Sequence, residues 1–146
     1  MTVLSSGSPL LLWNGFPVAF ALTCVIEVPA YLGAFSALGW VRPGRGPLGR
    51  GTAVALGFAV NMVTHPLLWA FALQAALTPR LLAEIVVALV EGGLVFAVVR
   101  RRGPYPETLL NRLAWSIMVA VGVNTLSLLV GLVLMPLITG QASAVA

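Results

Sequence analysis

Four long apolar runs alternate along the chain with short segments rich in proline, glycine and arginine. The runs cover approximately residues 14–39, 51–77, 81–99 and 112–137. Each is long enough for a helix that crosses a bilayer, which needs about 20 apolar residues. The alternating strands of about ten residues that build a membrane barrel are absent from the sequence. The pattern therefore predicts an all-α, polytopic membrane protein, a bundle of four transmembrane helices in which residues 1–146 form one domain.

The composition agrees with a membrane location. Hydrophobic residues make up 60% of the 146 positions and the mean hydropathy is +1.03, far outside the range of soluble domains. The single cysteine, Cys24, allows neither an intrachain disulfide nor a thiolate metal cluster. The lipid bilayer is therefore the first partner that the sequence predicts.

The charge of the chain is a property of its connections. The net charge is +4 and the pI is near 10.7, but the basic residues are all arginines that fall mainly in two loops, so no nucleic-acid partner is expected. Cytoplasmic loops of membrane proteins are enriched in Lys and Arg. The first connection holds Arg42, Arg45 and Arg50, the third holds Arg100, Arg101, Arg102 and Arg112, and the opposite side holds Arg80. We expect a bacterial-type inner (plasma) membrane protein with both termini on the non-cytoplasmic side.

Two groups of residues are expected at the membrane surface. Tryptophans near helix ends are typical of the aromatic belt at a bilayer interface, and the chain has three in such positions: Trp13, Trp40 and Trp115. Arg100, Arg101 and Arg102 are expected to bind anionic lipid, at about 1 kcal/mol per arginine. A docking site for a cytoplasmic partner is the alternative for this loop.

Polar residues recur near the middle of the apolar runs. Glu27, His65, Glu91 and Asn124 contribute one such residue to each run, at the same expected depth, and Asn61 lies one turn from His65. A charged side chain at this depth is costly, so it usually faces the bundle interior and marks a functional site. Interhelical hydrogen bonds that merely hold the helices together are the alternative, and for the two asparagines both explanations stay open.

Two prolines lie close to these residues. Pro29 follows Glu27 by two positions and Pro66 follows His65 directly, and neither proline can donate to the carbonyl four residues earlier, at Val25 and Met62. Interrupted helices frame the binding sites of many transporters. The prolines therefore favour a binding site at this level, although kinks without a function are also common.

A weak internal repeat relates the two halves of the chain. Residues 60–64 read VNMVT and residues 123–127 read VNTLS, and each Asn follows a mid-run Glu by 33 or 34 residues. Two tandem helical hairpins in the same orientation would be related by a pseudo-two-fold axis along the membrane normal. Both Glu carboxyls would then lie near that axis, and His65 would be present in one half alone.

The polar set has two chemical uses. Two carboxyls close together in a low dielectric cannot both be charged, so they would share a proton with each other or with His65, and Glu84 would extend this relay to the outer surface. The alternatives for Glu84 are contact with headgroup water or an ion pair with Arg80, four residues earlier. Alternatively, Glu27, His65 and Glu91 would bind a divalent metal, with the freed carbonyls and Asn as further ligands.

Enzyme motifs are scarce. The sequence has no GxGxxG, GKS, GKT or GxSxG motif and no aspartate, and no residue takes a convincing nucleophile role. The first hypothesis is a membrane protein that binds and moves a proton, cation or small solute at a midplane site, as a homo-oligomer or with a membrane-protein partner. An accessory subunit without a reaction of its own is the second hypothesis. An intramembrane enzyme, with or without a metal ion, is the third, and hydrolysis led by Glu27 or Glu91 is one form of it.

Overall fold

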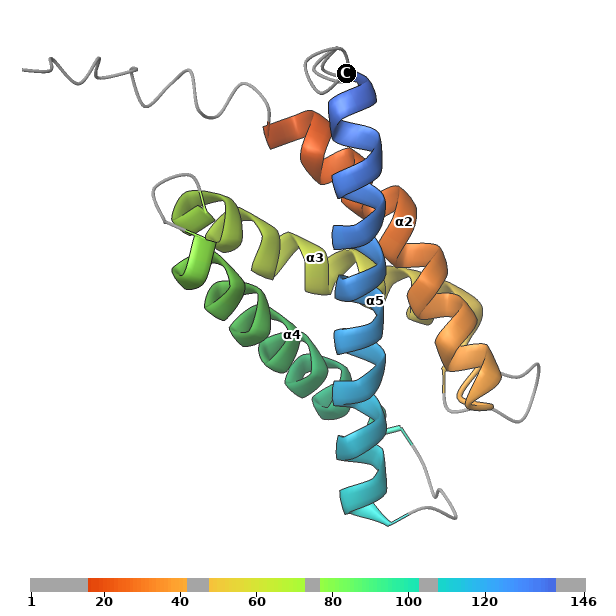
Figure 1. Ribbon diagram of the computed structural model, residues 1–146. Helices are drawn as coiled ribbons and strands as arrows, with labels where there is room; N and C mark the ends of the chain where they lie inside the picture. The colour runs from red at the N-terminus through yellow and green to blue at the C-terminus, as the bar shows by residue number, and fades with distance from the viewer. Residues whose placement is uncertain (1–15, 42–47, 73–76, 103–107, 139–146) are drawn as a thin grey trace, which may run out of the picture.

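The computed structural model describes residues 16–41, 48–72, 77–102 and 108–138, and these form four α-helices (Figure 1). The helices are α2 (Phe16–Ala37), α3 (Arg50–Ala72), α4 (Leu77–Val99) and α5 (Leu109–Ile138). All four are long and apolar enough to cross a membrane. The expected all-α, four-helix membrane bundle is confirmed.

The helices form a closed ring of neighbours. α2 packs against α3 and α5, and α4 packs against the same two helices. Within the described residues, the backbones of α2 and α4 do not approach each other closely, and neither do those of α3 and α5. Figure 1 shows α4 on the left of α5 and the C-terminal half of α2 on its right, with α3 crossing behind α5. A side chain that reaches from α2 to α4 must therefore pass through the middle of the bundle.

The C-terminal end of α2 is closed by a Schellman motif. Gly39 has a positive φ of 72°, its N–H donates to the Ser36 carbonyl, and the Trp40 N–H donates to the Phe35 carbonyl at 2.8 Å. The accompanying hydrophobic contact is the stacking of Trp40 on Phe35, with ring centroids 5.7 Å apart. Trp40 is consequently buried in the core, so its expected place in an aromatic belt is wrong. Trp115 is exposed, as a belt residue should be, and Trp13 lies outside the described residues.

Two helices begin earlier than the hydrophobic pattern predicts. α5 starts at Leu109, because the Thr108 hydroxyl caps it by accepting from the Asn111 N–H at 3.2 Å. α4 starts at Leu77, so residues 78–80, expected as the second connection, form its first turn instead. Pro79 fits there because the N–H groups of a first turn have no partner within the helix.

Many buried positions of the two hairpins correspond. The buried residues of α3 at 53, 56, 57, 60 and 61 have a buried counterpart on α5 63 residues later, whereas the counterparts of the buried Thr64 and Leu68 are half-buried. On α2, Glu27, Tyr31 and Phe35 are buried, and the residues 64 positions later on α4 are buried too. Together with the ring order of the helices, this correspondence supports the tandem-hairpin arrangement.

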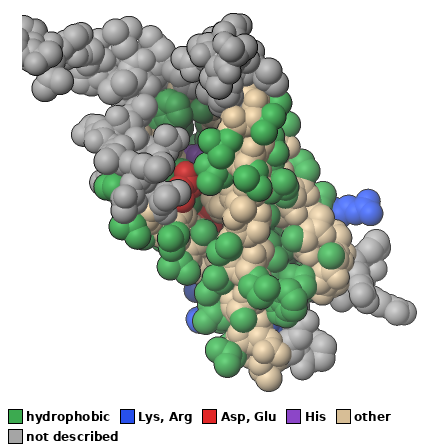
Figure 2. Space-filling view, in the orientation of Figure 1, with side chains coloured by type: hydrophobic (Ala, Val, Ile, Leu, Met, Phe, Trp, Pro, Cys, Tyr) green, Lys and Arg blue, Asp and Glu red, His purple; other side chains and the backbone are tan. Residues whose placement is uncertain are grey.

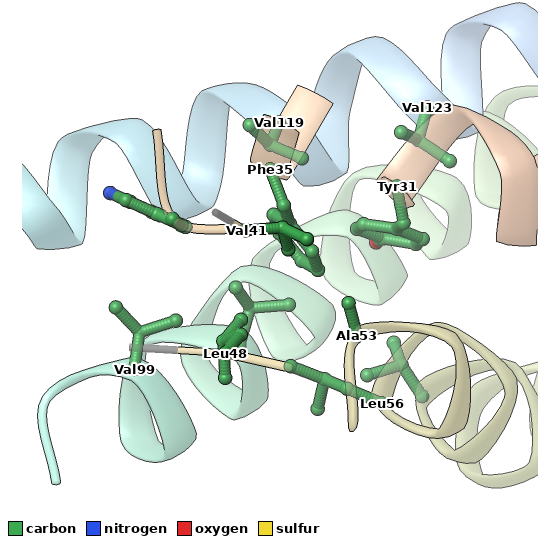
Figure 3. Close-up of a cluster of buried hydrophobic side chains, with 12 residues drawn as sticks. Tyr31, Phe35, Val41, Leu48, Ala53, Leu56, Val99, Val119 and Val123 are labelled. Atoms are coloured by element: carbon green, nitrogen blue, oxygen red, sulfur yellow. The ribbon is translucent and has the colours of Figure 1, made fainter. Parts of the chain in front are cut away.

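Aromatic and branched side chains fill the bundle beside the polar residues. Figure 3 shows Tyr31 and Phe35 of α2 lying between Val119 and Val123 of α5 and Ala53 of α3. The outer surface is also apolar: Figure 2 shows hydrophobic side chains over most of the visible face, with acidic and His side chains in one small area. Such a surface suits contact with lipid, because lipid tails replace water around the helices.

Candidate functional site

Glu91 receives hydrogen bonds from all three of the other helices. Its side chain is fully buried on α4. The Tyr31 hydroxyl of α2 donates to Oε2 at 2.8 Å, and the Thr64 hydroxyl of α3 lies 2.6 Å from Oε1. The Asn124 amide of α5 also donates to Oε2. We call Glu91, Tyr31, Thr64 and Asn124 the Glu91 cluster; it occupies the middle of the ring of helices.

Bonds within each helix orient two members of the Glu91 cluster. The amide of Asn124 also donates to the Ala120 carbonyl at 2.9 Å, and the Thr64 hydroxyl lies 3.0 Å from the Val60 carbonyl. Each contact spans four residues and directs the side chain along the helix toward the buried face. The donors are therefore held in place before they meet the carboxyl, which lowers the conformational entropy that the cluster loses on folding.

The electrostatics of the Glu91 cluster are those of a carboxyl held by neutral dipoles. All three partners are uncharged at neutral pH. Moving an ionised carboxyl out of water without hydrogen bonds is strongly unfavourable, and donors that point at its oxygens replace part of the lost hydration. The cluster can therefore accommodate a negative charge inside the bundle, and a protonated Glu91 fits it as well.

The second buried carboxyl has a different environment. Glu27 of α2 is 1% exposed, and its Oε1 lies 3.6 Å from Nε2 of His65 on α3, slightly too long for a direct hydrogen bond. Its Oε2 has no hydrogen-bond partner among the described residues. The His65 side chain is 16% exposed and meets the edge of the Phe20 ring, with centroids 6.2 Å apart. The Glu27–His65 pair thus has unused polar capacity and partial access to the surface.

Tyr31 connects the two carboxyl sites. It lies one helical turn after Glu27 on α2, on the same buried face, and it donates its hydroxyl to Glu91. The two carboxyl sites are therefore joined through Tyr31 and form one polar region rather than two isolated ones.

The expected site residues fall into several groups. Glu91 accepts a hydrogen bond from Asn124, and Oε1 of Glu27 lies 3.6 Å from Nε2 of His65. Asn61 is fully buried, but its amide donates to the Gly57 carbonyl of its own helix, and its Oδ1 has no partner among the described residues. Glu84 is half-buried on α4, two turns before Glu91. A relay through Glu84 stays a prediction.

Two members of the Glu91 cluster were not expected as site residues. Thr64 is part of the VNMVT segment of the internal repeat, but the repeat did not predict its contact with a carboxyl. Tyr31 was missed altogether. Its spacing of four residues from Glu27 was the available signal, since residues at i and i+4 share a helix face.

The prolines do not frame the polar region. α2 and α3 continue as helices through Pro29 and Pro66. Val25 and Met62, whose carbonyls the prolines leave without a helical partner, are 70% and 49% exposed. Both residues lie on the outward faces of their helices, so their positions give no support to the prediction that the freed carbonyls line an internal site.

The described residues include no group of three or more His, Cys, Asp or Glu side chains placed to hold a metal ion. Comparison with protein-family models, with curated proteins and with solved structures gave no match to the chain. The chemistry of the two carboxyl sites is therefore the basis for a function.

Proposed function

We propose that this multi-pass membrane protein binds and translocates protons through the Glu27–His65 pair and Glu91. The observation that carries the proposal is the buried Oε2 of Glu27, which has no partner among the described residues and belongs to a carboxyl 3.6 Å from a partly exposed imidazole. Buried polar groups normally have partners, and an exception is a sign of function. Histidine is a common group in proton shuttles, and a neighbouring carboxyl can exchange a proton with it.

A proton suits this region better than a metal ion or a larger solute. Tyr31 and Asn124 already direct N–H and O–H groups at Glu91, and donors repel a cation that needs the same oxygens. His65 Nε2 and Glu27 Oε1 are 3.6 Å apart. A small side-chain movement brings the two atoms within hydrogen-bond distance, and a proton can then pass directly between them. His65 is the entry group, because it is partly exposed, and Glu91 is the deeper acceptor.

The membrane and its sides follow from the arginines. Seven of the eight lie in the first and third connections or at the adjoining helix ends, so these face the cytoplasm of a bacterial-type inner membrane and both termini face the opposite side. Arg100, Arg101 and Arg102 contact anionic lipid there. Four helices leave little space for a pathway, so the protein works as a homo-oligomer or with a membrane-protein partner.

Proton flux in liposomes tests the proposal. The purified protein is reconstituted with an internal pH-sensitive dye, and a potassium diffusion potential drives protons inward. We expect flux above that of protein-free liposomes, and we expect Glu27→Gln to abolish it because the amide cannot accept the proton. Glu107→Gln, which changes the acidic residue outside the apolar runs, is the matched control and should retain flux.

Thermal unfolding of each variant accompanies the flux measurement. A Glu27→Gln protein that unfolds at the wild-type temperature and carries no flux supports the proposal. Wild-type flux in Glu27→Gln, or no flux in the wild-type protein itself, contradicts it.

A second candidate function is that of an accessory subunit, and the Glu91 cluster favours it. Donors from three helices converge on one carboxyl, which fixes the relative positions of all four helices. Under this second proposal the polar residues stabilise a scaffold for a partner. The same liposomes distinguish the two: a scaffold shows no flux, and Glu91→Gln lowers its unfolding temperature.

A further inference from the structure

The oxygens of Glu91 differ in how many hydrogens they already accept. Oε2 accepts one hydrogen from Tyr31 and one from Asn124, whose second amide hydrogen goes to the Ala120 carbonyl. Both lone-pair directions of Oε2 are therefore used. Oε1 contacts Thr64 alone among the described residues, so a proton on Glu91 has its place on Oε1, facing the Thr64 hydroxyl.

Thr64 has one hydrogen and two neighbours that accept. Its Oγ1 lies 2.6 Å from Oε1 of Glu91 and 3.0 Å from the Val60 carbonyl oxygen. A threonine hydroxyl donates once and accepts through its lone pairs. When Glu91 is ionised, the hydrogen of Thr64 points at Oε1 and the Val60 carbonyl loses it. When Glu91 is protonated, Glu91 donates to Oγ1 and the hydrogen of Thr64 returns to Val60.

We propose that Thr64 is a positioning residue that reverses its hydrogen bond with Glu91 as the proton comes and goes, and so couples the Glu91 cluster to the Glu27–His65 pair. Back-bonding of a hydroxyl to the carbonyl four residues earlier bends a helix. Reversal of the Thr64 bond therefore changes the local geometry of α3 at the residue next to His65. The reversal needs no covalent change at Thr64, because only the direction in which its hydroxyl hydrogen points is altered.

This inference rests on the proposed function in one respect, namely that Glu91 changes its protonation state.

The chain offers a matched control on α5. Thr125 makes the same type of contact, with its hydroxyl 2.7 Å from the Val121 carbonyl, but it is exposed and no contact with a carboxyl is seen for it in the described part of the chain. Removal of the Thr125 hydroxyl thus tests the backbone contact without the carboxyl.

Infrared difference spectroscopy across a pH titration reads the Glu91 acid directly. The carboxylic C=O band that disappears in Glu91→Gln belongs to Glu91. In Thr64→Val the acid loses its acceptor, so we expect the band at higher wavenumber. Thr64→Ser should restore the wild-type position, and Thr125→Val should leave the band unchanged. Thr64→Cys, with a weak S–H partner, should give an intermediate position and serves if Thr64→Val does not fold.

Two results would overturn the proposed reversal of the hydrogen bond between Thr64 and Glu91. One is a Glu91 band at the wild-type position in both Thr64→Val and Thr64→Cys. The other is a wild-type protein in which no protonated Glu91 band is seen at any pH that leaves it folded. Neither result depends on flux, so a failed flux assay with the expected band shifts would reject proton translocation while leaving the hydrogen-bond reversal intact.

Discussion

Glu27 and Glu91 are the same residue type at equivalent places in the two hairpins, and they differ in what surrounds them. Glu91 meets a phenol, a hydroxyl and an amide, whereas Glu27 meets an imidazole at 3.6 Å. The position that matches Tyr31 in the second hairpin is Val95, which has no donor to offer Glu27. This substitution accounts for one of the three contacts that Glu91 has and Glu27 lacks; the Asn61 amide, which corresponds to that of Asn124, donates to the Gly57 carbonyl instead.

The Tyr31 hydroxyl is expected to stabilise the bundle measurably. Tyr31→Phe keeps the ring packing and removes one donor from Glu91, so the free energy of unfolding should fall by about 1 kcal/mol, the scale of an interhelical hydrogen bond in a membrane. Denaturation of the purified protein in mixed micelles measures the change. Ser36→Ala removes an exposed bond to the Leu32 carbonyl and should have a smaller effect. Equal losses in the two variants would show that the Glu91 contact adds no stability.

The sequence predicts the polar residues of the site better than their contacts. Carboxyl, imidazole and amide groups are rare in apolar runs, so Glu27, His65, Glu91 and Asn124 are visible without a structure. Tyr31 was not visible in this way, because an aromatic residue is ordinary in a transmembrane helix. The prolines misled for a related reason: their positions along the chain match the site, but the direction in which they face depends on helix packing.

At the scale of helices, the apolar runs determine the spans and local hydrogen bonds determine the ends. The Schellman motif places Trp40 in the core, and the Thr108 cap sets the start of α5. A hydropathy pattern contains no information on the Schellman motif or the Thr108 cap. The predicted ends of the helices therefore differ from the observed ones. The crossing of α4 and α5 depends on a third local feature, the absence of a side chain at Gly92.

Gly92 is expected to be intolerant of alanine. A Cβ at this position would lie 2.8 Å from the Ile117 Cα of α5, so the helices would have to separate. We expect Gly92→Ala to lower the free energy of unfolding by about 1–3 kcal/mol, the usual cost of overpacking. Gly93→Ala is the matched control, since a Cβ there meets nothing within 4 Å. Micelle denaturation of both variants provides the comparison, and equal stability of the two would contradict the close crossing.

At the scale of the whole molecule, a closed ring of four helices explains why one carboxyl can contact three neighbours. The ring order places α2 opposite α4 and α3 opposite α5, as two tandem hairpins about a central axis would require. Many buried positions of the hairpins also correspond, and the polar region lies where these corresponding faces meet.

The orientation of the ring can be measured with single cysteines. In a Cys24→Ala background, Gly49→Cys places a thiol in the first connection, at an exposed position where a Cβ has room, and Ser143→Cys places one in the C-terminal segment. Because Arg-rich connections stay in the cytoplasm, a membrane-impermeant maleimide should label Ser143→Cys in intact bacterial cells. Gly49→Cys should react only after the membrane is opened. The reverse labelling pattern would show that the bundle has the opposite orientation in the membrane. Under the proposed function, protons taken up by His65 would then come from the opposite compartment.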